Sequence, residues 1–129
     1  MPAHVLIIED NEMSLVLAEH LLRQAGYTTS TAADGSAGVR LAMENLADLI
    51  LCDLDLPAMD GPQVVGALRT QPAWRAVPII AFTAAAIGED RRQVLTADFD
   101  GSILKPVDPR TFIAALAPYL APELRASQS

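Results

Sequence analysis

Residues 49–61 have the sequence Leu49-Ile50-Leu51-Cys52-Asp53-Leu54-Asp55-Leu56-Pro57-Ala58-Met59-Asp60-Gly61, and this stretch decides the fold. Its first four residues are apolar with no polar alternation, which is typical of a strand buried on both faces of a parallel sheet between helices. The run ends at Asp53, and Pro57 and Gly61 supply the turn that follows. Because ligands of such sheets bind outside the carboxyl ends of the strands, a functional site is expected at Asp53 and Asp55.

Three further apolar runs end in polar groups of complementary chemistry. Val5-Leu6-Ile7-Ile8 is followed by Glu9 and Asp10, Ile79-Ile80-Ala81-Phe82 by Thr83, and Ile103-Leu104 by Lys105. A single aspartate after a strand is most simply the start of a polar loop, and that alternative applies to Asp53 taken alone. Four strand ends that together carry acids, a hydroxyl and an ammonium instead favour one composite site at one edge of the sheet.

The residue types at these strand ends suit a divalent metal and a phosphoryl group. Crowded carboxylates repel one another unless a cation joins them, and Mg2+ prefers oxygen ligands such as those of Glu9, Asp10 and Asp53. The Thr83 hydroxyl and the Lys105 ammonium can bind phosphoryl oxygens. Since an aspartate can accept a phosphoryl group as a nucleophile, the set indicates phosphoryl transfer to a carboxylate.

With these motifs in order from Val5 to Tyr119, the chain resembles the receiver domain of two-component response regulators. The resemblance implies that Asp53 is the phosphoacceptor, that Glu9, Asp10 and Asp53 bind Mg2+ together with the backbone carbonyl of Asp55, that Thr83 is the switch hydroxyl, and that Lys105 is the counter-ion of the phosphoryl group. Pro106 is similar to a family proline that usually follows a cis peptide bond. The motifs Glu9-Asp10-Asn11-Glu12 and Thr83-Ala84-Ala85-Ala86 most resemble single-domain cell-division regulators.

The implied function is that of a phosphoacceptor switch, not of an enzyme. A sensor histidine kinase or a histidine phosphotransfer protein is the implied phosphoryl donor, and the chain assists its own phosphorylation and dephosphorylation. A downstream protein target is expected on the face from Gly88 to Phe112. Many receivers carry Tyr or Phe three residues before the active-site lysine, whereas this chain has Ser102. We therefore expect a graded switch without an aromatic gate.

The composition predicts one domain without a nucleic-acid or membrane partner. The 129 residues, 51% of them hydrophobic, suffice for one core, and we expect a receiver domain over residues 1–120 and a frayed tail over residues 121–129. The net charge of -7 disfavours nucleic acid and anionic membranes. No signal-peptide pattern and no apolar run near the ~18 residues of a membrane span is present, so a cytoplasmic location is expected.

The order of the predicted elements indicates the fold class. Helices are expected over residues 12–25, 36–45, 62–70 and 88–97 and after Asp108, and a further strand is expected over residues 27–32. Because crossovers between parallel strands are right-handed, this alternation predicts an α/β fold with a doubly wound five-stranded parallel sheet. The flavodoxin-like strand order 2-1-3-4-5 would place the first and third strands side by side.

Two other protein classes share part of this pattern. Asp53-Leu54-Asp55 also resembles the DxD motif of haloacid-dehalogenase-type phosphatases, which are enzymes. That motif normally lies on the first strand of a larger core, whereas here it follows the third strand. A flavodoxin-like flavin binder would fit the architecture, but the acids at residues 9–12 would repel the cofactor phosphate.

Overall fold

A five-stranded parallel sheet organises the chain. The computed structural model describes residues 3–54, 56, 59–84, 88–90, 93, 96 and 98–124. The strands are β1 (His4–Ile8), β2 (Thr28–Ala32), β3 (Leu49–Asp53), β4 (Ile79–Ala84) and β5 (Gly101–Lys105). They pair in the order β2-β1-β3-β4-β5, and every pairing is parallel. The predicted fold class and strand order are confirmed.

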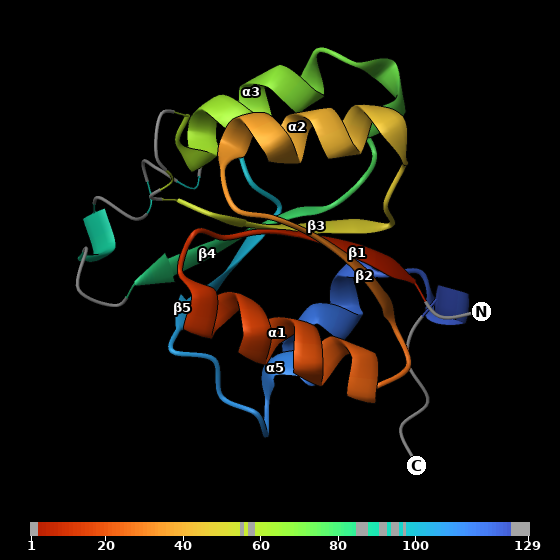
Figure 1. Ribbon diagram of the computed structural model, residues 1–129, viewed down its shortest axis with the longest axis vertical. Coiled ribbons are helices and arrows are strands. Elements are labelled where there is room, and N and C mark those ends of the chain that lie inside the picture. Colours follow the sequence, from red (N-terminus) through yellow and green to blue (C-terminus); the bar gives the residue numbers. More distant parts are fainter. Residues whose placement is uncertain are drawn as a thin grey trace.

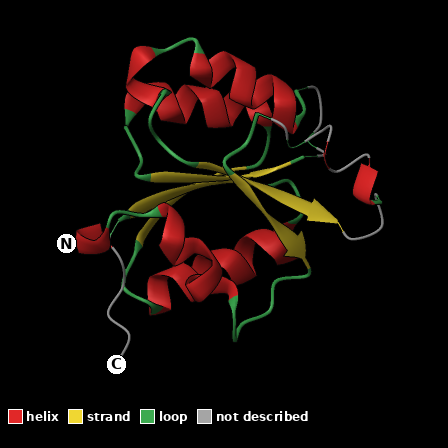
Figure 2. Cartoon of the chain, turned by 180° about the vertical axis from the view of Figure 1, so that it is seen from behind, coloured by secondary structure: helices red, strands yellow, loops and turns green. Residues whose placement is uncertain are grey.

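Helices cover both faces of the sheet. The α-helices are α1 (Glu12–Gln24), α2 (Gly35–Glu44), α3 (Gly61–Arg69) and α5 (Phe112–Leu116), and the 3-10 turns are η1 (Pro72–Trp74), η3 (Ala117–Tyr119) and η4 (Pro122–Leu124). Helices α2 and α3 lie on one face and α1 and α5 on the other, as Figure 1 shows and Figure 2 shows from behind. Among the described helices, none is both long and apolar enough to span a bilayer.

The central strand β3 is buried on both faces, as its apolar run predicts. Leu49 and Leu51 belong to the core beneath α1 and α5, whereas Ile50 and Cys52 belong to the core beneath α2 and α3. Burying one such aliphatic side chain stabilises the fold by roughly 1.5–3 kcal/mol. The strand therefore anchors both layers and holds Asp53 at its carboxyl end.

The last helix begins later than the sequence predicts. Asp108 does not open α5 directly, because its carbonyl accepts the N–H groups of Thr111 and Phe112 within a preceding turn. The helix starts at Phe112 and ends at Leu116. Five of the ten residues of the predicted helix over residues 88–97 lie outside those described.

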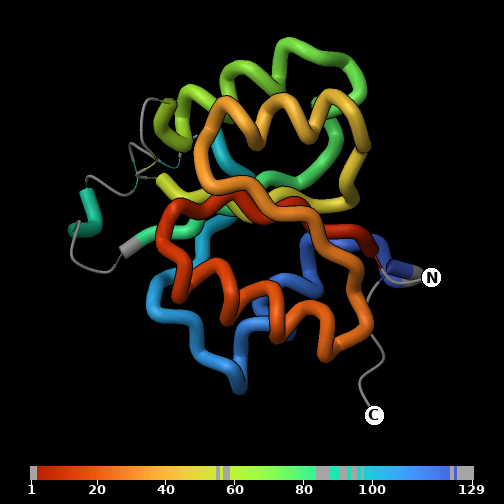
Figure 3. Tube along the Cα trace, viewed as in Figure 1, coloured from red at the N-terminus to blue at the C-terminus, as the bar shows by residue number. Residues whose placement is uncertain are grey.

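The first part of the segment predicted to fray forms the short turn η4 at residues 122–124. The N–H of Ala3 donates to the carbonyl of Leu124 at 3.1 Å, so the two ends of the described chain lie side by side (Figure 3). Leu124 also packs against the core beneath α1 and α5. Leu124 thus adds to the packing at the amino end of β1.

A guanidinium holds the loop that enters β4. Arg69 donates through Nη1 to the carbonyls of Trp74 at 2.6 Å and Val77 at 2.9 Å, and through Nη2 to Asp100 at 2.7 Å. The same Asp100 oxygen accepts the N–H of Ile79 at 2.8 Å. Since Trp74 is buried, this network fixes the loop indole against the domain. It lies at the amino end of β4, away from Asp53.

Candidate functional site

Three acids meet at the carboxyl edge of the sheet. Glu9 follows β1, Asp10 comes next, and Asp53 ends β3. Their carboxylate oxygens lie within 4.8 Å of one another, and Glu9 and Asp53 are buried while Asp10 is exposed. The adjacency of β1 and β3 brings them together because Ile8 pairs with Cys52, so Glu9 and Asp53, each one residue further on, share one position along the sheet.

Lys105 joins the two buried acids. Its ammonium lies 3.1 Å from Glu9 Oε2 and 3.3 Å from Asp53 Oδ1, and the lysine side chain is 19% exposed. Burial lowers the pKa of Lys105, but the carboxylates of Asp53 and Glu9 outweigh burial and raise the pKa above its ordinary value. Lys105 is therefore cationic at neutral pH and compensates part of the negative charge.

A backbone contact fixes the buried Glu9 carboxylate in place. Glu9 Oε1 accepts the N–H of Asn11 at 2.9 Å, which holds the carboxylate beside Lys105. Asn11 in turn caps α1, because its side chain accepts the N–H of Ser14 at 2.9 Å. The strand-to-helix turn thus orients Glu9 while it starts the helix.

The turn after Asp53 requires glycine at its far end. A Cβ on Gly61 would come within 2.8 Å of the Asp53 carbonyl oxygen and 2.9 Å of Leu54 Cα. The Gly61 N–H donates to the Leu54 carbonyl at 3.0 Å, and Asp60 forms a capping box with Gln63 at the start of α3. Gly61 therefore lies closely against the backbone of Asp53 and Leu54.

Of the other predicted features of the site, the structure describes Thr83 and the Lys105–Pro106 bond but not Asp55. Thr83 is buried near the end of β4, at the same edge as Asp53. The predicted cis peptide bond between Lys105 and Pro106 is present. Asp55 lies outside the described residues, so its predicted carbonyl contact to a metal stays a prediction.

Phe82 lies beside the site and was not predicted to take part in it. The Lys105 ammonium lies over the Phe82 ring, 5.6 Å from the centroid, and Phe82 stacks with Phe112. The signal that could have found Phe82 is the pairing of β4 with β5.

Burial, then the negative charge of Asp53, raises the pKa of the Cys52 thiol, which is therefore neutral and serves as a small core residue.

The donor set fits a hard divalent cation. Glu9, Asp10 and Asp53 offer one carboxylate oxygen each within a small volume, and Mg2+ binds one or two carboxylates together with water and phosphate oxygens. The three carboxylates leave an excess of negative charge beside Lys105. A cation with oxygen preference would relieve this excess, so the residues present fit Mg2+.

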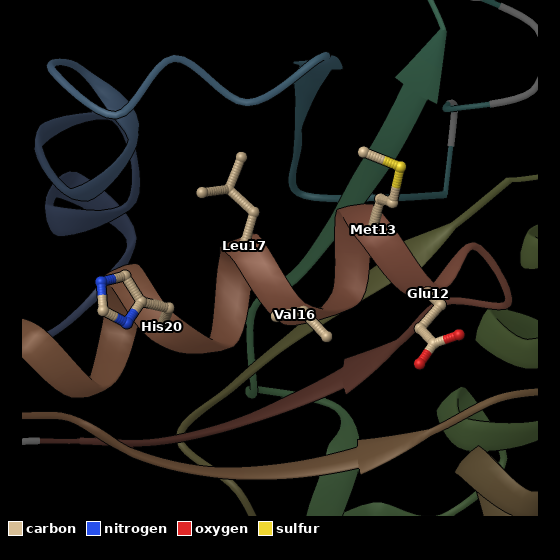
Figure 4. Close-up of a pocket in the computed structure, with 5 residues that line it drawn as sticks. All are labelled: Glu12, Met13, Val16, Leu17 and His20. Atoms are coloured by element: carbon tan, nitrogen blue, oxygen red, sulfur yellow. The ribbon is translucent and has the colours of Figure 1, made fainter.

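An apolar surface on α1 adjoins the acids. Met13 is 83% exposed and Val16 57% exposed, although both are large and hydrophobic. With Glu12, Leu17 and His20 they line a pocket of about 510 Å³ along α1, and Met13 and Leu17 project from the same side of the helix (Figure 4). We call these five residues the α1 surface.

The fold and site define a doubly wound α/β protein with a buried, lysine-paired aspartate at a switch point of the sheet. The profile of the response regulator receiver domain matches residues 5–117. The chain belongs to this family. Family membership favours the receiver interpretation over the phosphatase and flavin-binding alternatives.

Individual relatives support the same placement. The chain is 35% identical to the polar-differentiation response regulator DivK of Brucella anthropi, over 93% of this chain and 98% of DivK. Among solved structures, CheY4 of Vibrio cholerae superimposes with a TM-score of 0.86 at 30% identity, covering 93% of this chain and all of CheY4.

A third relative was crystallised with a metal. The receiver domain of the sensor histidine kinase PA1611 from Pseudomonas aeruginosa has a magnesium ion coordinated in its active-site cleft. It superimposes with a TM-score of 0.83 at 34% identity, covering 92% of this chain and 98% of that one. The resemblance to single-domain cell-division regulators agrees with the similarity to DivK.

Proposed function

We propose that the protein is a phosphoacceptor switch in which Asp53 receives a phosphoryl group from a phosphohistidine. The donor is a sensor histidine kinase or a histidine phosphotransfer protein. An Asp53 carboxylate oxygen attacks phosphorus, the phosphorus–nitrogen bond breaks, and its electron pair returns to the imidazole of the donor. The observation that carries the proposal is the contact of the Lys105 ammonium with Asp53 at 3.3 Å, beside two further acids.

Each side chain has a defined part in this reaction. Glu9, Asp10 and Asp53 would hold Mg2+, which supplies charge neutralisation at the phosphoryl oxygens. Lys105 offers a fixed ammonium to an equatorial phosphoryl oxygen, and Thr83 offers a hydroxyl from the end of β4. Movement of Thr83 toward the phosphoryl group would pull on the segment that follows β4, and so change the Gly88 to Phe112 face presented to a target protein.

The first test uses a small phosphoryl donor. Acetyl phosphate with Mg2+ should add one phosphoryl group to the protein, detected by intact mass, and Asp53→Asn should abolish the addition. Asp48→Asn is the matched control, since Asp48 immediately precedes the same strand at its opposite end. Persistence of the mass shift in Asp53→Asn, or its loss in Asp48→Asn, contradicts the assignment.

The α1 surface is the proposed contact for the donor protein. It begins two residues after Asp10 and exposes large apolar side chains, and exposed apolar patches commonly mark protein interfaces. Met13→Asp should therefore slow transfer from a histidine phosphotransfer protein while leaving the acetyl phosphate reaction unchanged. Met43→Asp, on α2, is the control, because Met43 is also exposed but lies on the other face of the sheet. Equal transfer rates for the two variants would remove the α1 surface from the proposal.

The downstream switch can be tested by hydrogen exchange. Beryllofluoride, a phosphoryl mimic, should change the exchange of residues 84–97 in the wild type and change it less in Thr83→Ala. Ser102 stands where many receivers have an aromatic residue, so we expect a graded switch. In such a switch the active conformation is already partly populated before phosphorylation. Equal responses in the two proteins would show that Thr83 does not carry the signal.

A cytoplasmic location stays a prediction from the sequence.

A further inference from the structure

One aromatic ring lies in the row of side chains that forms the site. Asp53 on β3 pairs with Phe82 on β4, and Phe82 pairs with Ile103 on β5. Glu9 follows β1, which borders β3 on its other side. From β1 to β5 the row is therefore Glu9, Asp53, Phe82 and Ile103. Phe82 separates the buried acids from the strand that carries the lysine.

Lys105 must extend across this ring to reach the acids. It is two residues beyond Ile103 on β5, so its side chain starts on the same face of the sheet as Phe82. Neighbouring strands are about 4.8 Å apart, and β4 lies between β5 and β3. The ammonium nevertheless lies 3.3 Å from Asp53 and 3.1 Å from Glu9. Along this path it lies over the Phe82 ring, 5.6 Å from the centroid.

The ring itself is firmly held. Phe82 is fully buried, and it stacks with Phe112 of α5 at a centroid distance of 6.4 Å and an interplanar angle of 19°. An aromatic face carries partial negative charge and attracts a cation within about 6 Å of its centroid. A leucine at position 82 would supply apolar volume but no such face. The Lys105 ammonium thus contacts the Phe82 ring, and the Phe82 ring contacts Phe112 of α5.

We propose that Phe82 is a positioning residue for Lys105, with its ring face supporting the ammonium between Glu9 and Asp53 and Phe112 holding the ring against α5. The effect of Phe82 on phosphorylation rests on the proposed function of Lys105. The contact between ring and ammonium does not, because it is present in the protein before any phosphoryl group is added.

The test weakens the ring face without changing the shape of the core. Phenylalanine at position 82 is replaced site-specifically by its mono-, di- and trifluoro analogues, since each fluorine withdraws electron density from the ring face. The rate constant for phosphorylation by acetyl phosphate, at saturating Mg2+ and donor, should fall progressively, by about threefold over the series. The same series at Phe99, which packs against the opposite core, is the control and should leave the rate unchanged.

A thermodynamic cycle tests the contact independently of phosphorylation. The unfolding midpoint without Mg2+ is measured over the Phe82 series in the wild type and in Lys105→Met. The double variant Glu9→Gln/Lys105→Met serves as a second background that leaves fewer unpaired charges in the core. The midpoint should change more steeply with fluorine number in the wild type, because only there does the ring face a cation.

The outcomes separate the two hypotheses. Equal slopes in the wild type and in the lysine-free backgrounds would overturn the role of Phe82, whatever the phosphorylation result. A rate that is constant over the Phe82 series, or that falls equally over the Phe99 series, would also overturn it. Failure of the wild type to accept a phosphoryl group would refute the proposed function, while the cycle would still decide whether Phe82 supports Lys105.

Discussion

Replacement of Lys105 by methionine should destabilise the metal-free protein strongly. The ammonium lies 3.1 Å from Glu9 and 3.3 Å from Asp53, and both carboxylates are buried. At an effective dielectric constant of about 20, each contact represents a gross Coulomb energy of about 5 kcal/mol. Desolvation and the partial exposure of Lys105 offset much of this energy. Removing one partner of a buried ion pair typically costs ~3–5 kcal/mol, and this is the loss of unfolding free energy that we expect.

The charge balance of the site predicts two changes that should raise the free energy of unfolding. Glu9→Gln/Lys105→Met should be more stable than Lys105→Met, because Glu9→Gln removes one of the two uncompensated buried charges. Mg2+ at ten times its dissociation constant should stabilise the wild type by roughly 1.4 kcal/mol, since it binds the folded state alone. Urea unfolding followed by circular dichroism, with EDTA or with Mg2+, measures each of these differences.

The pH dependence of this difference has a defined sign. The pKa of Lys105 is raised in the folded state, so its contribution to stability is fully present below the ordinary lysine pKa of about 10.4. The contribution is lost as pH rises through the higher folded-state pKa. The gap between the wild type and Lys105→Met should therefore be constant from roughly pH 7 to pH 9 and should shrink above about pH 10.4.

A matched control and a refuting result complete this experiment. Arg110→Met removes a cation that lies 3.4 Å from Asp108 but is 89% exposed, and it should change stability very little. If Lys105→Met unfolds at the wild-type urea concentration in EDTA, the pairing of Lys105 with buried acids contributes nothing. If the double variant is no more stable than Lys105→Met, the argument from unpaired charge is wrong.

Three further predictions concern α3, the helix that follows the turn after Asp53. Arg69→Met should lower the unfolding free energy by about 2–3 kcal/mol in urea, because three loop carbonyls and Asp100 lose a charged donor. Gly61→Ala should cost about 1–3 kcal/mol and slow acetyl phosphate labelling, because its Cβ would press on the Asp53 carbonyl. Gly66→Ala should instead stabilise by ~0.5–1 kcal/mol in thermal unfolding, since its Cβ would meet nothing within 4 Å.

The sequence predicts the sheet and the acidic site well because both follow from local patterns. An unbroken apolar run such as Leu49 to Cys52 has few solutions other than a strand buried on both faces. Once the strands are parallel, their carboxyl ends meet at one edge, so Glu9, Asp53 and Lys105 are brought together by topology alone. No precise distance is needed for that conclusion.

Contacts between distant segments were not predictable in this way. The carbonyl of Leu124 accepts the Ala3 N–H across the two ends of the chain, and no local pattern marks that pairing. Arg69 has the sequence signature of a polar residue at a helix end, but its acceptors are backbone carbonyls of a loop. The start of α5 was misplaced because an aspartate before a proline indicates a turn as readily as a helix cap.

The position of Lys105 between two acids also bears on how the site would respond to phosphorylation. Three carboxylates and one ammonium, that is three negative charges and one positive charge, give a formal charge of -2, which a divalent cation would balance. An acyl phosphate on Asp53 carries about one more negative charge than the carboxylate it replaces. Since Lys105 is held almost equally by Glu9 and Asp53, this added charge would draw the ammonium from Glu9 toward the phosphoryl oxygens. The ammonium lies over Phe82, which stacks on Phe112 of α5. A small displacement of the ammonium would therefore change the packing of Phe82 against α5, and Phe82 directly precedes Thr83 on β4.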